Sequence, residues 1–196
     1  MGKIFYIMGK SASGKDKIYS LLGANEKLGL NRLVLYTTRP IRAGEEDGKN
    51  YFFTDEKKLK EFRRKGCLIE ARNYNTVHGI WTYFTADDGQ VDLSRSDYLG
   101  IGTLESFIKM RKYYGKDAVC PLYIQVEDGE RLSRALKRER EQANPKYEEM
   151  CRRFLADQLD FSEENVAKAG IWRRFVNDDL DTCVSEIVSY IEEVRK

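Results

Sequence analysis

The sequence predicts an α/β fold in which helices flank a parallel β-sheet. Strand-like and helix-like segments alternate along the 196 residues, as they do when helices connect parallel strands. The first segment, residues 3–8, carries a continuous apolar run at 4–8, which is typical of a strand buried on both faces. It leads directly into a glycine-rich turn and a helix whose apolar residues recur at helical spacing.

Apolar periodicity and turn residues predict the remaining elements. A helix is expected at 16–22, where Ile18 and Leu22 lie on one face. Asp55 and Asp181 are expected N-caps, because a short carboxylate accepts hydrogen bonds from the free N–H groups at a helix start. Pro145 is expected in a first helical turn. The other expected strands are 32–36, 68–72, 80–84, 98–101, 119–126 and 172–176, and the other expected helices are 104–111, 130–141 and 145–163.

Composition and charge exclude several classes of protein. Lys and Arg number 34 against 32 Asp and Glu, and this net charge of +2 argues against a protein that coats a nucleic acid polymer. The longest apolar runs are strand-sized, so no segment is expected to span a membrane. No secretory signal is recognisable at the start. We therefore expect one cytoplasmic domain.

The turn after the first strand has the spacing of a phosphate-binding loop. Residues 9–16 read G-K-S-A-S-G-K-D, which matches G-x-x-x-x-G-K between a strand and a helix. Backbone N–H groups and the helix N-terminus cradle phosphate oxygens in such a loop. The expected ATP-binding residues of the loop are Gly9, Ser11, Ala12, Ser13, Gly14, Lys15 and Asp16.

Asp16 stands where this motif usually has Ser or Thr. A carboxylate about 4 Å from a phosphate charge costs about 4 kcal/mol at an effective dielectric of 20. A cation between the two charges would remove that cost. Either Asp16 binds Mg²⁺ directly or the nucleotide site is weakened, and our hypothesis is direct ligation.

Residues 37–53 carry a longer and more specific pattern. They read T-T-R-P-I-R-A-G-E-E-D-G-K-N-Y-F-F and resemble the guanylate kinase signature T-T-R-x-x-R-x-G-E-x-x-G-x-x-Y-x-F at every fixed position. With the phosphate loop and V-N-D-D at 176–179, the resemblance covers nearly the whole chain. It implies transfer of the γ-phosphate of ATP to GMP, with Mg²⁺ as cofactor and nucleotides as the small-molecule partners.

The resemblance also implies three structural parts. A P-loop NTPase-type core is expected at 1–36, 86–127 and 158–196. An inserted acceptor-binding lobe is expected at 37–85, and a helical lid at 128–157. Small lobes inserted on hinges suit an enzyme that closes over its substrates and excludes water.

The acceptor-binding residues are expected on the inserted lobe. Arg39 and Arg42, three residues apart, can both bind one phosphate. The resemblance adds the Tyr51 hydroxyl as a further donor. It also matches Glu70 to the glutamate that accepts hydrogen bonds from the guanine edge. His78 stands where the family usually has a phosphate-binding tyrosine, and it either takes that role or is structural.

Two lid arginines and one asparagine complete the expected site. By the resemblance, Arg138 and Arg153 close over the transferring phosphoryl group, whose oxygens carry charge that cations stabilise. With Lys15 and Arg39, they are the expected catalytic residues. Asn177 resembles the asparagine that contacts the adenine of ATP, and its alternative role is to turn the chain.

The chain departs from the family pattern around the acceptor base. Leu35 and Ile80 replace hydroxyl-bearing residues, and Gly100 and Gly102 align with an Asp-x-Asp motif. If metal positioning has changed there, Asp16 compensates. Two alternatives therefore stay open: a kinase for another nucleoside monophosphate, and a non-catalytic module that binds nucleotides or phosphopeptides.

Overall fold

The computed structural model describes residues 1–76 and 79–196. Within them, a five-stranded sheet forms the core, in the order β2-β7-β1-β8-β9 and parallel throughout. All five residues of the central strand are buried, as predicted. The strands are β1 (Ile4–Met8), β2 (Asn31–Arg32), β7 (Tyr98–Gly102), β8 (Val119–Gln125) and β9 (Arg174–Val176).

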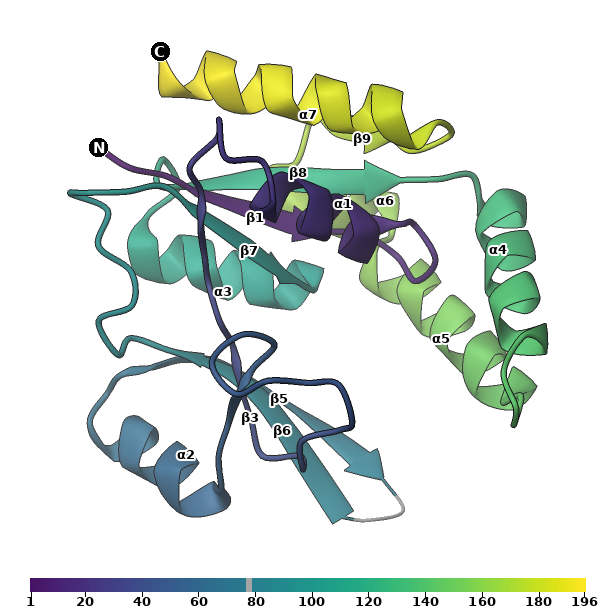
Figure 1. Ribbon diagram of the computed structural model, residues 1–196, viewed down its shortest axis with the longest axis horizontal. Coiled ribbons are helices and arrows are strands. Elements are labelled where there is room, and N and C mark those ends of the chain that lie inside the picture. The colour runs from purple at the N-terminus through teal and green to yellow at the C-terminus, as the bar shows by residue number, and fades with distance from the viewer. Residues whose placement is uncertain (77–78) are drawn as a thin grey trace.

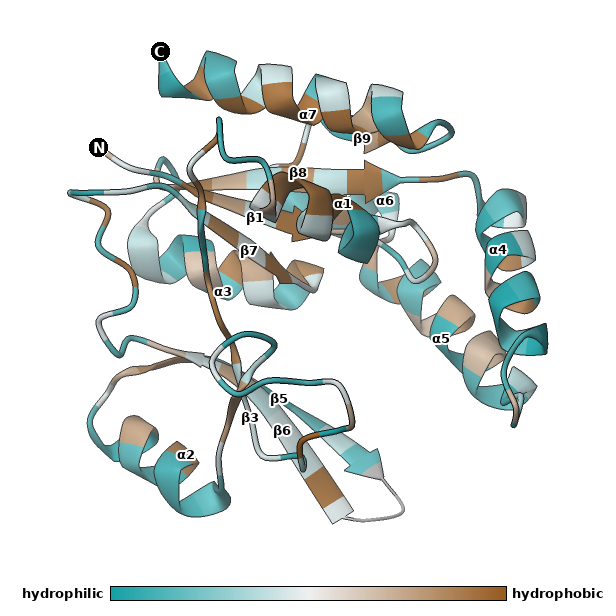
Figure 2. Cartoon of the chain, in the orientation of Figure 1, coloured by the Kyte–Doolittle hydropathy of each residue, from teal (hydrophilic) through white to brown (hydrophobic). Residues whose placement is uncertain are grey.

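Helices cover both faces of this sheet (Figure 1). On one face, Phe5 and Ile7 of β1 pack with α1 (Lys15–Gly23) and α7 (Leu180–Arg195). On the other, Ile4 and Met8 pack with α3 (Leu104–Tyr114) and α6 (Glu163–Lys168). Hydrophobic residues accordingly concentrate on the strands and on the inner helix faces (Figure 2). The predicted α/β fold is confirmed.

A second, mixed sheet of four strands lies to one side, in the order β4-β3-β6-β5. One face is apolar and packs on α2 (Glu56–Arg64) through Leu59, Phe62 and Phe84. As predicted, Asp55 caps α2. The strands are β3 (Tyr36–Thr37), β4 (Phe52–Phe53), β5 (Leu68–Thr76) and β6 (Gly79–Ala86).

The opposite face of the β5–β6 hairpin is polar, because side chains alternate between the two faces of a strand. Glu70 pairs with Thr85 across the hairpin and Arg72 pairs with Tyr83. The Tyr74 ring contacts the Tyr83 ring, with 5.5 Å between their centroids. These five residues are called the polar hairpin face below.

The chain passes between the two sheets through residues 33–35. The predicted single strand at 32–36 is wrong, because β2 joins the core sheet and β3 joins the second one. At this crossing the Gln90 side chain binds both backbone groups of Val34. Its Oε1 accepts from the Val34 N–H at 2.8 Å, and its Nε2 donates to the Val34 carbonyl at 3.2 Å. Gln90 belongs to the segment that returns to the core, so the two connections are tied together.

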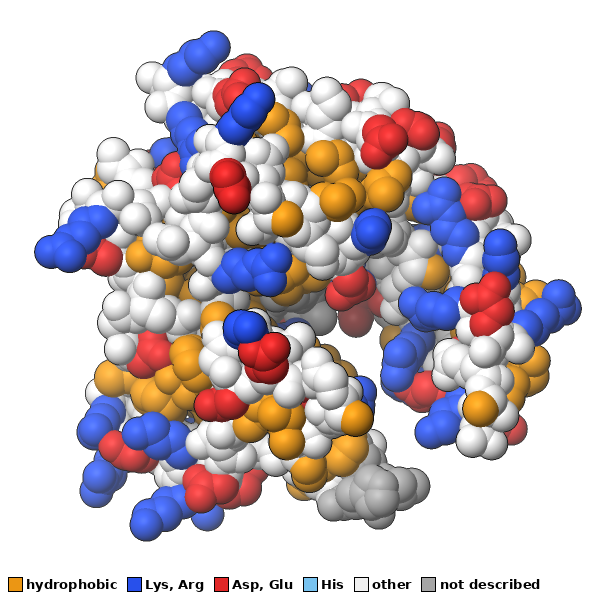
Figure 3. Space-filling model, viewed as in Figure 1, with side chains coloured by type: hydrophobic (Ala, Val, Ile, Leu, Met, Phe, Trp, Pro, Cys, Tyr) orange, Lys and Arg blue, Asp and Glu red, His pale blue; other side chains and the backbone are white. Residues whose placement is uncertain are grey.

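Two charged helices, α4 (Asp128–Arg140) and α5 (Tyr147–Asp160), form an arm beside the core (Figure 1). The predicted helix at 145–163 is wrong at both ends. Its N-cap is Lys146, so Pro145 precedes the helix, and α5 ends before the separate α6. The space-filling view is hollowed between this arm and the second sheet, and Lys and Arg side chains line the arm's inner edge (Figure 3).

The last helix begins at a different aspartate from the one expected. Asp179 is the N-cap, since its carboxylate accepts a 2.9 Å hydrogen bond from the Thr182 N–H. Asp181 lies inside the first turn, so the prediction that it caps the helix is wrong. No helix in the described part of the chain is long and apolar enough to cross a bilayer.

Candidate nucleotide-binding site

The phosphate loop joins β1 to α1, and the Asn177 side chain packs against it and holds it by a hydrogen bond. Gly14 has a φ of +84°, and a Cβ there would lie 2.3 Å from Nδ2 of Asn177. That Nδ2 donates a 2.8 Å hydrogen bond to the Ser13 carbonyl, and Asn177 is only 4% exposed. Asn177 therefore holds the loop in shape in this structure, while its expected contact with adenine stays a prediction.

Lys15 and Asp16 open α1, where the helix N-terminus favours negative charge. Nζ of Lys15 lies 3.7 Å from Oδ2 of Asp16, whose side chain is 86% exposed. No cluster of three or more metal-ligating side chains occurs among residues 1–76 and 79–196. Magnesium is usually held by one or two carboxylates together with nucleotide phosphates and water. A single exposed carboxylate at the phosphate loop fits that arrangement.

The arm is joined to the phosphate loop by two partly buried hydrogen bonds. The Asp157 carboxylate accepts a hydrogen bond from the Ser11 N–H at 2.6 Å, and Nη1 of Arg131 donates to the Ser11 carbonyl at 2.9 Å. Arg131 is 1% exposed, with its guanidinium 4.6 Å from the ring centroid of Phe154.

The Arg131 guanidinium is also bound by Asp128, whose Oδ1 accepts a 2.8 Å hydrogen bond from Nη2. Burial alone would raise the pKa of Asp128, but hydrogen bonds from Gln158 and Arg131 lower it to about 2. Arg131 and Asp157 were not predicted as site residues. Arg131 was one of several basic residues on a charged helix, and no motif marks Asp157.

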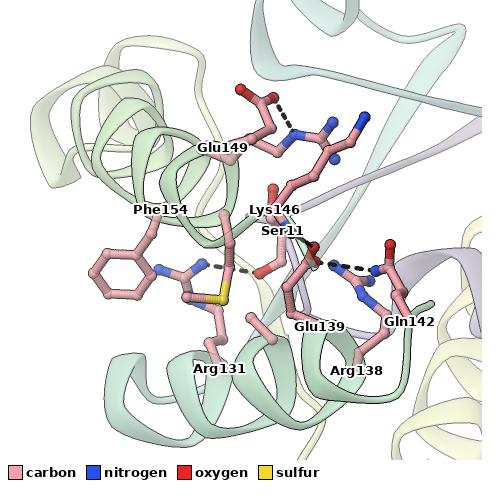
Figure 4. A pocket seen from close by; sticks show the side chains of 11 residues that line it. Ser11, Arg131, Arg138, Glu139, Gln142, Lys146, Glu149 and Phe154 are labelled. Atoms are coloured by element: carbon pink, nitrogen blue, oxygen red, sulfur yellow. Dashed lines mark hydrogen bonds and ion pairs between the residues drawn. The ribbon is translucent and has the colours of Figure 1, made fainter. Parts of the chain in front are cut away.

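Arg138 and Arg153 line a cavity of about 230 Å³ between α4 and α5, together with Ser11 (Figure 4). Nε of Arg153 donates to Glu149 at 2.7 Å. Arg138 is exposed and makes no ion pair with any described residue. The structure therefore brings both predicted lid arginines to one cavity beside the phosphate loop, and Arg138 is the one open to a ligand.

The two arginines predicted to bind the acceptor phosphate differ in accessibility. Arg39 is 3% exposed, and its guanidinium forms a two-point ion pair with Glu45, while Nε donates to the Tyr83 hydroxyl at 2.9 Å. The hydrogen bonds from Arg39 lower the pKa of Glu45 to about 2. Arg42 is exposed, 5.9 Å from the ring centroid of Trp81. Only Arg42 presents its guanidinium fully to solvent.

Tyr51 lies next to Arg39 and Tyr83, in the segment predicted as the acceptor-binding lobe. Its ring lies 5.2 Å from the Arg39 guanidinium and 5.5 Å from the Tyr83 ring. Burial raises the pKa of Tyr51, and the negative charge of Asp16 on α1 contributes in the same direction. Tyr51 therefore contacts the polar hairpin face through the ring of Tyr83.

Glu70 is completely buried and already paired. Nε of Arg72 donates to its Oε2 at 3.0 Å, and the Thr85 hydroxyl donates to its Oε1 at 2.9 Å. Arg72 was not predicted from the sequence, although the spacing of two residues between Glu70 and Arg72 signals that they share a strand face. His78, the remaining acceptor residue predicted, lies outside the described residues.

Tyr6 of β1 fills the space above Gly100 and Gly102 on β7. A Cβ at Gly100 would lie 2.7 Å from the Tyr6 ring, and one at Gly102 would lie 2.2 Å from the Tyr6 hydroxyl. That hydroxyl pairs with the Ser106 hydroxyl at 2.8 Å. Burial raises the pKa of Tyr6, and the charge of Glu70 adds to the effect. Any side chain at these glycines, a carboxylate included, is sterically excluded while Tyr6 is in place.

Known proteins are similar in sequence to this chain over nearly its whole length. The family model for guanylate kinase matches residues 1–86. The guanylate kinase of Wolbachia pipientis is 30% identical over 199 residues, covering 99% of this chain and 91% of its relative. The chain belongs to the guanylate kinase family.

Other members of the guanylate kinase family agree in length and fold. The guanylate kinase of Porphyromonas gingivalis is 26% identical over 190 residues, which cover 95% of each chain. The crystal structure of guanylate kinase from Anaplasma phagocytophilum is 20% identical and superposes with a TM-score of 0.60. That match covers 98% of this chain and 85% of the other, so the two proteins share a fold.

Proposed function

We propose that this chain is an ATP-dependent nucleoside monophosphate kinase that transfers the γ-phosphate of ATP to GMP, giving ADP and GDP. The observation that carries the proposal is the position of the phosphate loop across the hollow from the acceptor lobe. Asp16, at the start of α1, is close enough to affect the pKa of Tyr51 on the lobe. A donor phosphate on the loop and an acceptor phosphate on the lobe would therefore lie near each other.

The residues fit a direct transfer without a covalent intermediate. The acceptor phosphate would be held by Arg42 and the Tyr51 hydroxyl, with the positive charge of Arg39 behind them. Lys15 would neutralise the β- and γ-phosphate oxygens, and Arg138 would approach from the arm. These cations stabilise charge that develops on the transferring phosphoryl group.

Magnesium fits this site through Asp16. The Asp16 carboxylate would help hold the ion, which would supply positive charge to neutralise the transferring group. We also propose that the core, lobe and lid have the boundaries expected from the sequence, and that the lid closes over ATP. Closure would exclude water and so suppress ATP hydrolysis.

An end-point nucleotide assay tests the proposal. Purified protein, ATP and Mg²⁺ are incubated separately with GMP, dGMP, AMP, UMP, CMP and IMP, and the products are resolved by chromatography. Formation of GDP supports the proposal if it is lost in Lys15→Met and retained in Lys17→Met, an exposed neighbour that serves as the control. Bound ATP with no diphosphate from any acceptor would refute the kinase and favour a non-catalytic binding module.

A further inference from the structure

The Glu70 carboxylate is not accessible to the base of an acceptor nucleotide, because Arg72 and Thr85 already occupy both of its oxygens. Its side chain is 0% exposed, and both oxygens accept hydrogen bonds from Thr85 and Arg72. A base that reached this carboxylate would have to displace the guanidinium of Arg72. Breaking a buried ion pair leaves charge unpaired at low dielectric, which is strongly unfavourable.

Arg72 itself has donors to spare. Its Nε and one Nη2 N–H face Glu70, at 3.0 and 3.4 Å. No described residue accepts from its Nη1, so the outer edge of the guanidinium offers parallel N–H donors. The side chain is 12% exposed, which places this edge between Glu70 and solvent.

The surroundings of Arg72 place it at the acceptor side of the hollow. Arg72 pairs with Tyr83 across the hairpin, and the Tyr83 ring lies 5.5 Å from the ring of Tyr51 on the acceptor lobe. The charge of Glu70 keeps the pKa of Arg72 raised, although burial alone would lower it. Gly100 and Gly102 have no side chain and so bring no second carboxylate to this region, and Tyr6 occupies the space above them.

We infer that Arg72, held in place by Glu70, is the residue that reads the acceptor base, and that it selects a base edge carrying two neighbouring hydrogen-bond acceptors. This inference rests on the proposed function and deepens it. Among purines, the 6-oxopurines present such an edge with O6 and N7, whereas adenine presents a donor at N6. Glu70 is a positioning residue in this arrangement, and the group at purine C2 is not read.

The inference predicts unusual acceptor tolerance. GMP, IMP and XMP share O6 and N7 and differ at C2, so their kcat/KM values should agree within about threefold. A carboxylate that reads guanine would instead discriminate strongly, because IMP lacks the 2-amino donor and XMP carries a carbonyl there. Unpaired polar groups in a site built for hydrogen bonding produce large discrimination.

Measurements on the unmodified protein come first. Equal kcat/KM for the three 6-oxopurine monophosphates supports the inference, and a preference of 30-fold or more for GMP over IMP overturns it. Preference for CMP also overturns it, because the inference assigns a purine. If the protein shows no turnover, calorimetry without ATP compares the Kd values of GMP and IMP in place of their kcat/KM values.

Variants then assign the effect to Arg72. Arg72→Ala should weaken GMP and IMP binding alike by tenfold or more, while Arg64→Ala, an exposed residue at the end of α2, should leave both unchanged. The double variant Glu70→Gln with Arg72→Ala avoids an unpaired buried carboxylate and should show the same loss. Tighter GMP binding in either Arg72 variant would show that Arg72 only blocks Glu70.

A further variant and the two readouts separate the inference from the proposed function. Glu70→Gln should weaken binding without changing the GMP-to-IMP ratio, whereas a base-reading Glu70 would change that ratio. Equal binding of GMP and IMP that depends on Arg72, with no phosphoryl transfer, refutes the kinase and retains the inference. GMP phosphorylation with IMP excluded retains the kinase and refutes the inference. No binding of either nucleotide refutes both.

Discussion

Replacing Asn177 by alanine tests how the phosphate loop keeps its shape. The change removes the 2.8 Å hydrogen bond to the carbonyl of Ser13, a residue that is 0% exposed. A buried acceptor left without a partner costs about 1–3 kcal/mol. For a chain of this size, each kcal/mol lowers Tm by about 2–4 °C. We therefore expect a fall of several degrees in thermal denaturation, and no fall for Asn31→Ala, whose side chain is exposed on β2.

The same variant separates loop support from recognition of adenine. A deformed loop would bind the phosphates of ATP and GTP equally poorly, so the KM values for both donors should rise by the same factor. The assay holds the acceptor constant and compares ATP with GTP. Unchanged Tm together with a selective loss for ATP would refute our reasoning and assign Asn177 to the adenine.

Three further perturbations test other parts of the structure. Arg42→Ala should raise KM for the monophosphate acceptor about tenfold or more, because a charge-assisted hydrogen bond of about 1.5–3 kcal/mol is lost, and KM for ATP should not change. Arg63→Ala on α2 is the control. Equal effects on the KM values of both substrates would remove Arg42 from the acceptor site. Gly102→Ala should lower the free energy of unfolding, measured in urea, by about 1–3 kcal/mol, because its methyl group would lie 2.2 Å from the Tyr6 hydroxyl and 2.4 Å from the Ser106 hydroxyl. Gly129→Ala is the control and should be tolerated, because its methyl group meets only the flexible end of the Glu127 side chain. The pKa of Glu45 falls from 4.5 to about 2 in the folded protein, so its contribution to stability is present above pH 4.5 and lost as pH falls through about 2. The difference in Tm between the unmodified protein and Glu45→Gln should therefore vanish over that pH range. A Tm difference independent of pH would contradict the pairing with Arg39.

Short-range patterns predicted the core and the phosphate loop because both depend on neighbouring residues. The apolar run of β1, the loop glycines and the first turn of α1 follow one another within about twenty residues. The split at residues 33–35 was not predictable in this way. Leu33 and Leu35 are both buried, as in one strand, but the Leu33 N–H donates to the Leu99 carbonyl on β7, whereas the Leu35 carbonyl accepts from the Phe52 N–H on β4.

The sequence indicated candidate residues of the site, but not the residues that hold them in place. Arg39 matched a motif, yet its burial depends on Tyr83, 44 residues away. The tie from Asp157 to Ser11 spans 146 residues and follows no repeating pattern. Tyr6 offered no signal either, because an aromatic residue in an apolar strand is ordinary. For Arg72, the spacing of two residues from Glu70 is visible in the sequence. The burial of the Glu70–Arg72 ion pair, which makes Arg72 important, is visible only in the structure.

The amide of Gln90 has a consequence for how the second sheet can move. Both chain connections between the sheets pass this point, and the side chain pairs with Val34 as a neighbouring strand would. A motion that draws the two connections apart breaks both hydrogen bonds, whereas a motion that turns them together breaks neither. A turn of the second sheet about this point therefore keeps both hydrogen bonds, and the packing of Ile69 on β5 against the core cluster is the further contact that such a turn must rearrange.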